Sequence, residues 1–418
     1  MTAGGRAMRQ RMMSMEKLSD DELSNIFIRL PARQLVQMRC VSKPWNVFLS
    51  TESSYLTKSH LNHSLRNKHN EIVLAFTVRN KGGPEVWPYN LSGTPFTNLS
   101  DLVKVPADKI PLMRLSSKGG HVIGSVNGLL CFYIGPPDFV KGIYIWNPSL
   151  SLIMPLYVLC DPKWAHSYNY RFYFGFGFDP KTDDYKVVKL VRDHGKLMWL
   201  PVEVYSMKKR SWEFIVDSFP SDVDKGFDMC VDDHDGHLHW LCKMVDNNDI
   251  QTIVAFDLGV ESPSFRQISL PDSVASNCDT DNLQHTKLCM LHGKLCVVSY
   301  TIYDHGEGKL QVWVMNEYGV AESWVKSHVL SNLKGEHTIP IGFTLNSKFL
   351  FHDNIKGVLA SYDQETATVT HLGSYRLLHC LGEVVQYVDS LVWYAGPSHE
   401  EWVKVAQQYY FETMGLKF

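Results

Sequence analysis

The residues best suited to metal chemistry lie in the segment Asp232-Asp233-His234-Asp235-Gly236-His237-Leu238-His239. His237 and His239 are two positions apart, so in a strand both imidazoles point to the same face, and imidazole is a common zinc ligand. Asp235-Gly236 is also a typical hairpin turn, which places the segment between two strands. The turn interpretation is favoured over a metal site, and the sequence predicts no bound metal or other cofactor.

Two glycine-containing segments resemble catalytic or phosphate-binding motifs only in part. In Gly124-Ser125-Val126-Asn127-Gly128 the serine takes the second position, whereas a nucleophile elbow has it in the middle, and the surroundings indicate a strand, a turn and a second strand. Gly175-Phe176-Gly177 lacks the following helix that a phosphate-binding loop needs. These segments favour turns and close packing, and no catalytic residue is predicted.

The composition also limits the partners and the compartment. Lys and Arg number 41 against 44 Asp and Glu, which predicts neither nucleic-acid binding nor attraction to an anionic membrane. The nine cysteines form no Cys-x-x-Cys pair, and residues 1–17 lack the apolar stretch of a signal peptide. We therefore expect reduced thiols and an intracellular location, in the cytoplasm, the nucleus or both. No apolar run approaches the ~20 residues that span a bilayer.

The secondary-structure elements that must position these residues follow two different patterns in two parts of the chain. Residues 18 to about 60 predict short helices, because Leu23, Ile26, Phe27 and Leu30 follow helical spacing. Ser19 to Glu22 form a capping box that begins the first helix. Leu30-Pro31 ends it and allows a second helix to begin, and Ser42 before Pro44 predicts the cap of a third.

From about residue 70 the chain predicts short strands that return at a fixed spacing. Tight turns near positions 128, 182, 236, 293 and 347 are separated by 54, 54, 57 and 54 residues. Aromatic residues near strand ends recur with steps of 57, 59, 51, 57 and 49 at Tyr89, Trp146, Tyr205, Phe256, Trp313 and Tyr362. A unit of roughly 50 residues with four strands is typical of a kelch propeller blade. Six anchors predict an all-β propeller of six kelch-like blades, each with four antiparallel strands, in which the two ends of the segment complete one blade.

The helical segment resembles an F-box. Its matching residues are Leu18 to Leu23, Ile26 to Pro31, Leu35, and Met38 to Trp45, where Arg39, Val41, Ser42, Lys43 and Trp45 follow the family pattern. Ser19 stands where the family usually has proline, and serine caps the same turn. The resemblance implies a small three-helix F-box domain over residues 15–60.

The remainder resembles the kelch-related F-box-associated domain of plant F-box proteins. The likeness is carried by segments that include Gly124 to Leu130, Ile145 to Ser149, Gly175 to Pro180, Leu238 to Leu241 and Val312 to Met315. It implies a propeller over residues 70–396, followed by a tail over 397–418. It also implies a non-catalytic substrate receptor of an SCF ubiquitin ligase, with a Skp-type adaptor, a cullin reached through it, and an unidentified target protein as partners.

This resemblance assigns two candidate surfaces. The F-box residues expected to contact the adaptor are Leu18, Leu23, Ile26, Leu30, Pro31, Leu35, Val41 and Trp45. Long irregular loops on one face of the propeller are expected to bind the target through Trp164, His166, Tyr168, Arg192, Trp199 and Tyr303. Two alternatives stay open: a propeller scaffold outside the ligase, and a kelch-type metalloenzyme that would need convergent Tyr, His and Cys ligands.

Overall fold

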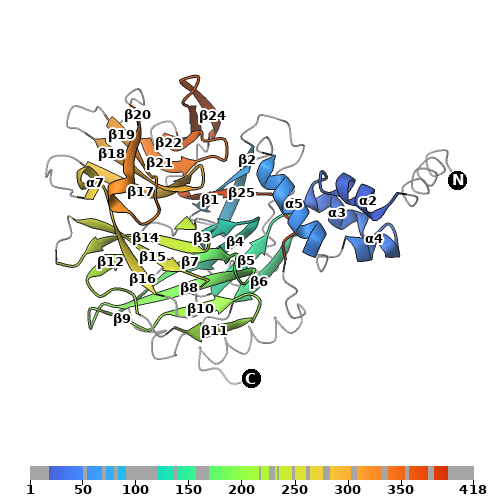
Figure 1. The fold of residues 1–418 in the computed structure, drawn as a ribbon, viewed down its shortest axis with the longest axis horizontal. Coiled ribbons are helices and arrows are strands. Elements are labelled where there is room, and N and C mark those ends of the chain that lie inside the picture. The colour runs from blue at the N-terminus through green and yellow to red at the C-terminus, as the bar shows by residue number, and fades with distance from the viewer. Residues whose placement is uncertain are drawn as a thin grey trace.

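In the part of the chain that the structure describes, four helices precede a ring of antiparallel sheets (Figure 1). The structure is a computed structural model, and it describes residues 18–49, 54–67, 72–79, 83–90, 120–135, 140, 142–156, 169–215, 218–225, 231–232, 235–246, 250–259, 264–275, 283–302, 308–330, 338–353, 357–374 and 381–393. The helices before the ring are α2 (Asp20–Phe27), α3 (Ala32–Met38), α4 (Lys43–Phe48) and α5 (Ser54–Arg66). Among the described residues, no helix is long and apolar enough to cross a membrane.

The strands form six sheets, in each of which the first strand named is the innermost. The first has β3 (Gly120–Val126), β4 (Leu129–Ile134), β5 (Gly142–Asn147) and β6 (Leu152–Leu156). The second has β7 (Tyr170–Asp179), β8 (Asp184–Asp193), β9 (Met198–Trp199) with β10 (Glu203–Ser206), and β11 (Ser211–Phe214). The third has β12 (Val223–Lys225) with β13 (Val231–Asp232), β14 (His237–Met244), β15 (Gln251–Asp257) and β16 (Phe265–Ser269).

The remaining three sheets complete the ring. The fourth has β17 (Leu283–Leu291), β18 (Lys294–Ile302), β19 (Gly308–Met315) and β20 (Trp324–Leu330). The fifth has β21 (Thr338–Phe343), β22 (Phe349–Asp353), β23 (Val358–Asp363) and β24 (Thr368–Ser374). The sixth has β25 (Leu381–Tyr387), β1 (Ile72–Arg79) and β2 (Gly83–Asn90). Two short helical segments, α7 (Asp272–Ala275) and η3 (Ala321–Ser323), lie between strands.

These sheets are the blades of a propeller. Five of them have four or five strands, which is enough for a complete blade, so the described residues show five such blades where the sequence predicted six. The sixth sheet has three described strands, and residues 91–119 lie outside the described residues. The expected fold class, a small helical domain followed by a propeller of antiparallel blades, is confirmed at that level.

The hydrophobic cores lie between neighbouring blades. Phe176 and Val187 of the second sheet pack with Ile145 of the first, and Trp240 of the third packs with Val188 of the second. Each of these side chains is at least nine-tenths buried. Middle strands such as β8 and β15 are buried on both faces, and β15 therefore has a continuous apolar run, whereas outer strands such as β16 keep exposed polar residues.

The turns that the sequence repeat marked have the backbone geometry of tight hairpins. Asn127 and Gly128 join β3 to β4 with φ of 53° and 82°, and His292 and Gly293 join β17 to β18 with φ of 53° and 73°. Positive φ at both central residues matches the right-handed twist of the strands. The repeat of turns therefore corresponds to the hairpin between the first two strands of successive blades.

The ring closes between its two chain ends. β1 pairs antiparallel with β25, and Ile72 lies opposite Tyr387. The two ends of the ring therefore meet in one sheet, as predicted, but the three described strands of that sheet do not complete a four-stranded blade. Residues 390–393 after β25 are not a strand, because this segment is held by the first sheet and by the helices.

Two residues of the first sheet hold this closing segment, defined as residues 387–393. Asn147 is fully buried, and its Nδ2 donates hydrogen bonds to the carbonyl oxygens of Ser390 (3.0 Å) and Val392 (2.8 Å). A Cβ atom added at Gly128 would lie 2.3 Å from Ser390 Cβ and 2.5 Å from the Val388 carbonyl oxygen. Gly128 is therefore required by its positive φ and by this close approach.

We expect Gly128→Ala to be much more damaging than Gly293→Ala. Both glycines have positive φ in the same type of turn, which costs an alanine about 1–2 kcal/mol. Gly293 has nothing within 4 Å of an added Cβ. Displacing the closing segment should cost Gly128→Ala a further 1–3 kcal/mol or so in the free energy of unfolding. Urea denaturation of both variants measures the difference, and equal losses of stability would contradict this packing.

Candidate functional site

The helical domain begins with the caps that the sequence predicted. The Ser19 backbone N–H donates to Glu22 Oε2 (2.9 Å), and the Glu22 N–H donates to Ser19 Oγ (3.3 Å). These bonds hold the pKa of Glu22 below its usual range, so their contribution is present above that range and is lost as the pH falls. The Trp45 N–H donates to Ser42 Oγ (3.3 Å), which caps α4.

The residues expected to contact the adaptor divide by burial. Leu23, Leu35 and Trp45 are at most 7% exposed and pack together with Phe27, whose ring meets that of Trp45 edge-on at 5.4 Å. These three form the core of the helical domain, and their contact with an adaptor stays a prediction. The other five are partly or well exposed: Leu18, Ile26, Leu30, Pro31 and Val41.

The structure also shows an exposed apolar residue that is not among the expected adaptor contacts. Val47 of α4 is 73% exposed, more than Ile26 (38%) or Val41 (40%). Its position could have been inferred, because Trp45 and Leu49 are four residues apart and both face the core, which turns Val47 away. Ile26, Val41 and Val47 are therefore the exposed large apolar residues of the described F-box residues 18–49, and Tyr55 of α5 is also exposed.

The helical domain is fixed to the propeller by a shared core. Leu150, in the turn between β5 and β6, and Leu391, in the closing segment, pack into the same cluster as Phe27 and Leu56. All four are at most 9% exposed. Lys58 of α5 also pairs with Asp183, in the turn between β7 and β8, at 2.9 Å. The helices thus sit on the side of the ring where these hairpin turns lie.

Asp389 of the closing segment joins three parts of the chain. Its Oδ2 accepts a hydrogen bond from the Ala32 N–H at the start of α3 (2.7 Å), and its Oδ1 accepts one from the Ser149 hydroxyl. The Ser149 N–H donates to Tyr387 Oη (3.1 Å), and burial, with the nearby Asp389 charge, raises the pKa of Tyr387 well above its usual value. The Asn147-Pro148-Ser149 segment therefore holds the closing strand and, through Asp389, the helices.

The expected target-binding residues do not form an exposed cluster among the described residues. Trp164, His166, Tyr168 and Tyr303 lie outside the described residues. Arg192 and Trp199 are 3% and 6% exposed, and the Arg192 guanidinium lies 5.1 Å from the centre of the Trp199 ring. Arg192 lies opposite Trp199 where β8 pairs with β9, and both side chains are buried in the blade. Target contact through these two residues stays a prediction.

The histidines of the metal-like segment have other partners. His239 is buried, its Nε2 lies 2.8 Å from Tyr318 Oη, and its Nδ1 lies 3.2 Å from the Val231 carbonyl oxygen. The His237 ring lies 4.8 Å from the Tyr318 ring. In the described part of the chain, no group of three or more His, Cys, Asp or Glu side chains could hold a metal. His237 and His239 of the third sheet both contact Tyr318, which lies between β19 and β20 of the fourth sheet, so these contacts connect the two sheets.

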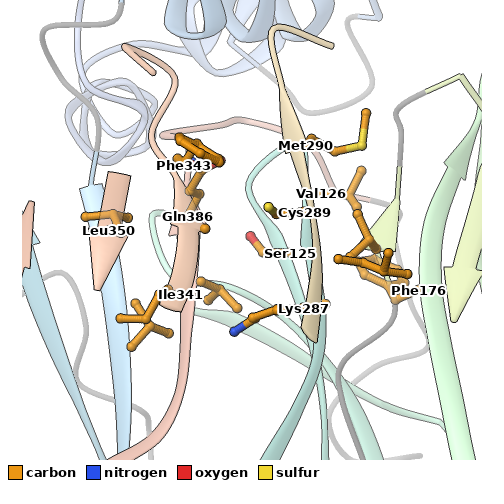
Figure 2. A pocket seen from close by; sticks show the side chains of 16 residues that line it. Ser125, Val126, Phe176, Lys287, Cys289, Met290, Ile341, Phe343, Leu350 and Gln386 are labelled. Carbon is orange, nitrogen blue, oxygen red and sulfur yellow. The ribbon is translucent and has the colours of Figure 1, made fainter. Parts of the chain in front are cut away.

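A cavity of about 170 Å³ lies on the propeller axis, where the innermost strands meet (Figure 2). Each of the six sheets contributes to its lining, from the strands β3, β7, β13, β17, β21, β22 and β25. Figure 2 shows Ser125 and Lys287 directing their polar atoms toward the space between the strands. We call this cavity the central channel.

One wall of the central channel carries a thiol with a close neighbour. Cys289 lines the channel, and its Sγ lies 3.1 Å from Sγ of Cys296, its partner across the β17–β18 hairpin. Cys296 is fully buried, and burial raises the pKa of its thiol well above the usual value. Burial raises the pKa of Cys131 in the same way. Both thiols are therefore kept protonated.

The described residues thus define a two-part protein, a capped helical domain packed against a ring of antiparallel blades, and comparison with known families identifies it. Residues 15–57 match the F-box domain, and residues 74–351 match the F-box associated beta propeller domain. The second match covers more than half of the chain. The protein therefore belongs to the F-box proteins that carry an F-box-associated propeller, which confirms the resemblance seen in the sequence.

Its relatives include plant F-box proteins. The Arabidopsis thaliana F-box protein CPR1 is 29% identical over 331 residues, covering 73% of this chain and 71% of CPR1. The F-box/kelch-repeat protein At3g23880 of the same plant is 26% identical over 324 residues, covering 76% of this chain and 80% of the relative. Among solved structures, a chain of a nidogen/laminin complex aligns with a TM-score of 0.43 at 12% identity, over 77% of this chain and 99% of that one.

We expect the cysteines to differ in reactivity according to burial. Cys40 is exposed, whereas Cys131 and Cys296 are buried with raised pKa values, so little of either is thiolate at pH 8. Iodoacetamide should modify Cys40 at least about a hundredfold faster, as measured by peptide mass spectrometry. In urea the three rates should converge. Equal rates in the folded protein would contradict the buried placement.

Proposed function

We propose that this protein is the substrate-recognition subunit of an SCF ubiquitin ligase. In this proposal the F-box binds a Skp-type adaptor, which connects it to a cullin, and the propeller holds a target protein. The chain itself is non-catalytic and acts by proximity, since a held target lysine experiences a high effective concentration of the conjugating enzyme. The observation that carries the proposal is the family membership together with exposed apolar residues on a domain that is fixed to a propeller.

The adaptor is proposed to bind where the F-box keeps apolar side chains in solvent. Ile26, Val41 and Val47 come from α2, the link before α4, and α4. Their burial by a partner would be favourable, whereas the core residues already bury their area within the domain. Leu18, Leu30 and Pro31, which are partly exposed, are proposed to border this surface.

The propeller is proposed to have six blades. β25, β1 and β2 would be the first three strands of the sixth, because β25 lines the central channel as the other innermost strands do. Tyr89, in β2, also holds the third-strand position that Trp146 and Trp313 hold in their sheets. The division into residues 15–60, 70–396 and 397–418 stays a proposal, with one adjustment: α5 extends the helical part to Arg66.

The target is proposed to bind the face of the ring opposite the F-box. The F-box contacts hairpin turns at Leu150 and Asp183, and in antiparallel blades the links between hairpins lie on the other face. Trp164, His166, Tyr168 and Tyr303 belong to such links and stay candidates for target contact. Arg192 and Trp199 are buried inside the blade, where they stack on each other.

Substituting two exposed F-box residues should separate adaptor binding from folding. Ile26→Asp combined with Val47→Asp places charges where an apolar partner surface would desolvate them, and should weaken Skp adaptor binding by more than about thirtyfold. Val325→Asp is the matched control, because Val325 is a 49% exposed valine in the propeller. Titration calorimetry with purified adaptor measures both, after melting curves show that each variant is folded.

The same variants distinguish the ligase from the alternatives. Affinity purification with mass spectrometry should recover adaptor, cullin and target with the wild-type protein, and target alone with the double variant. Undiminished adaptor capture by the double variant would contradict the proposed surface. Recovery of partners without any adaptor from the wild-type protein would instead support a scaffold outside the ligase.

A further inference from the structure

The central channel contains a cationic group that no described residue neutralises. Lys287 lies on the innermost strand β17 and is partly buried, and the described residues that line the cavity include no aspartate or glutamate. Within the described part of the chain, no ion pair or hydrogen bond engages its ammonium. A partly desolvated charge of this kind is less costly when an anion accompanies it.

The rest of the lining is suited to an organic molecule better than to water alone. Ser125 on β3 and Gln386 on β25 supply a hydroxyl and an amide. Ile341 and Met290, which are partly exposed, supply apolar surface around the same space (Figure 2), whereas the Phe176 and Leu350 side chains at its border are at most 2% exposed. A ligand with one anionic end and an apolar body would satisfy both kinds of lining.

The size of the cavity limits that body. Its volume is about 170 Å³. An apolar protein cavity of roughly 150 Å³ accommodates benzene, so the space is sufficient for a single ring bearing a small acidic group.

We propose that the central channel is a binding site for a small monocarboxylate with a ring-sized apolar body, whose carboxylate pairs with Lys287 Nζ and whose body contacts Ile341 and Met290. The Ser125 hydroxyl would donate a second hydrogen bond to the carboxylate. The proposal rests on the channel alone and is independent of the F-box and its adaptor.

Benzoate is the probe, and benzamide is its neutral isostere. Titration calorimetry on the full chain should show benzoate binding with one site and a Kd at or below about 1 mM, with benzamide at least about tenfold weaker. Binding should also shift the δ1-methyl resonance of Ile341, which locates the ligand in the channel. Absence of benzoate binding at roughly 10 mM, or equal affinity for benzamide, would overturn the proposal.

Two variants and one control identify the residues. Lys287→Met keeps the chain length and should weaken benzoate binding about tenfold or more while leaving benzamide unchanged. Ser125→Leu should fill the space and remove binding of both probes. Lys294→Met is the control, because Lys294 is an exposed lysine of the same hairpin whose ammonium donates to Asn316 (3.0 Å). Benzoate affinity unchanged in a folded Lys287→Met protein would overturn the assignment.

Discussion

The carboxylate of Asp389 is the contact on which both the ring and the position of the F-box depend. It accepts hydrogen bonds from the Ala32 amide and the Ser149 hydroxyl, and so connects the first turn of α3 to a blade. Asp389 follows β25, the strand that closes the ring on β1. The segment that follows the closing strand therefore also forms part of the surface against which the F-box packs. Leu391 of this segment belongs to the hydrophobic core of the helices.

This shared junction has a functional consequence for a receptor. Proximity catalysis is effective only if the target is held at a defined position relative to the conjugating enzyme, and a flexible linker would spread that position over many geometries. Because the helices share a hydrophobic core with Leu150 and Leu391, the F-box and the ring form one packed unit. The proposed adaptor surface and the proposed target face thereby keep a constant separation.

Much of this fold could be predicted because its signals are local. The capping residues Ser19 and Ser42 act within three positions, and hairpin turns such as Asn127-Gly128 depend on backbone preferences of two residues. Their repetition along the chain indicated the propeller. The number of strands in the last blade was less predictable, because residues 390–393 have strand-like composition. Instead of pairing as a strand, this segment accepts a hydrogen bond from Asn147 and packs against the helices.

The functional surfaces were predicted less well, for a physical reason. Asp389 and Ala32 are 357 residues apart, and no local pattern indicates that they meet. Trp199 and Arg192 have the residue types of interface anchors, yet they stack on each other inside a blade, since amphipathic side chains serve cores and interfaces equally well. The central channel is formed by strands from distant parts of the chain, so no local sequence pattern indicates that Lys287 belongs to a site.

Native-state hydrogen exchange on the wild-type protein tests the central claim of a single packed unit. If closure and docking are one event, the backbone amides of α3, including that of Leu35, should exchange through the same opening as those of β25. Their opening free energies should agree and should fall together as urea is added. Exchange of the α3 amides at much lower free energy, with β25 still protected, would show that the F-box opens independently and would contradict this account.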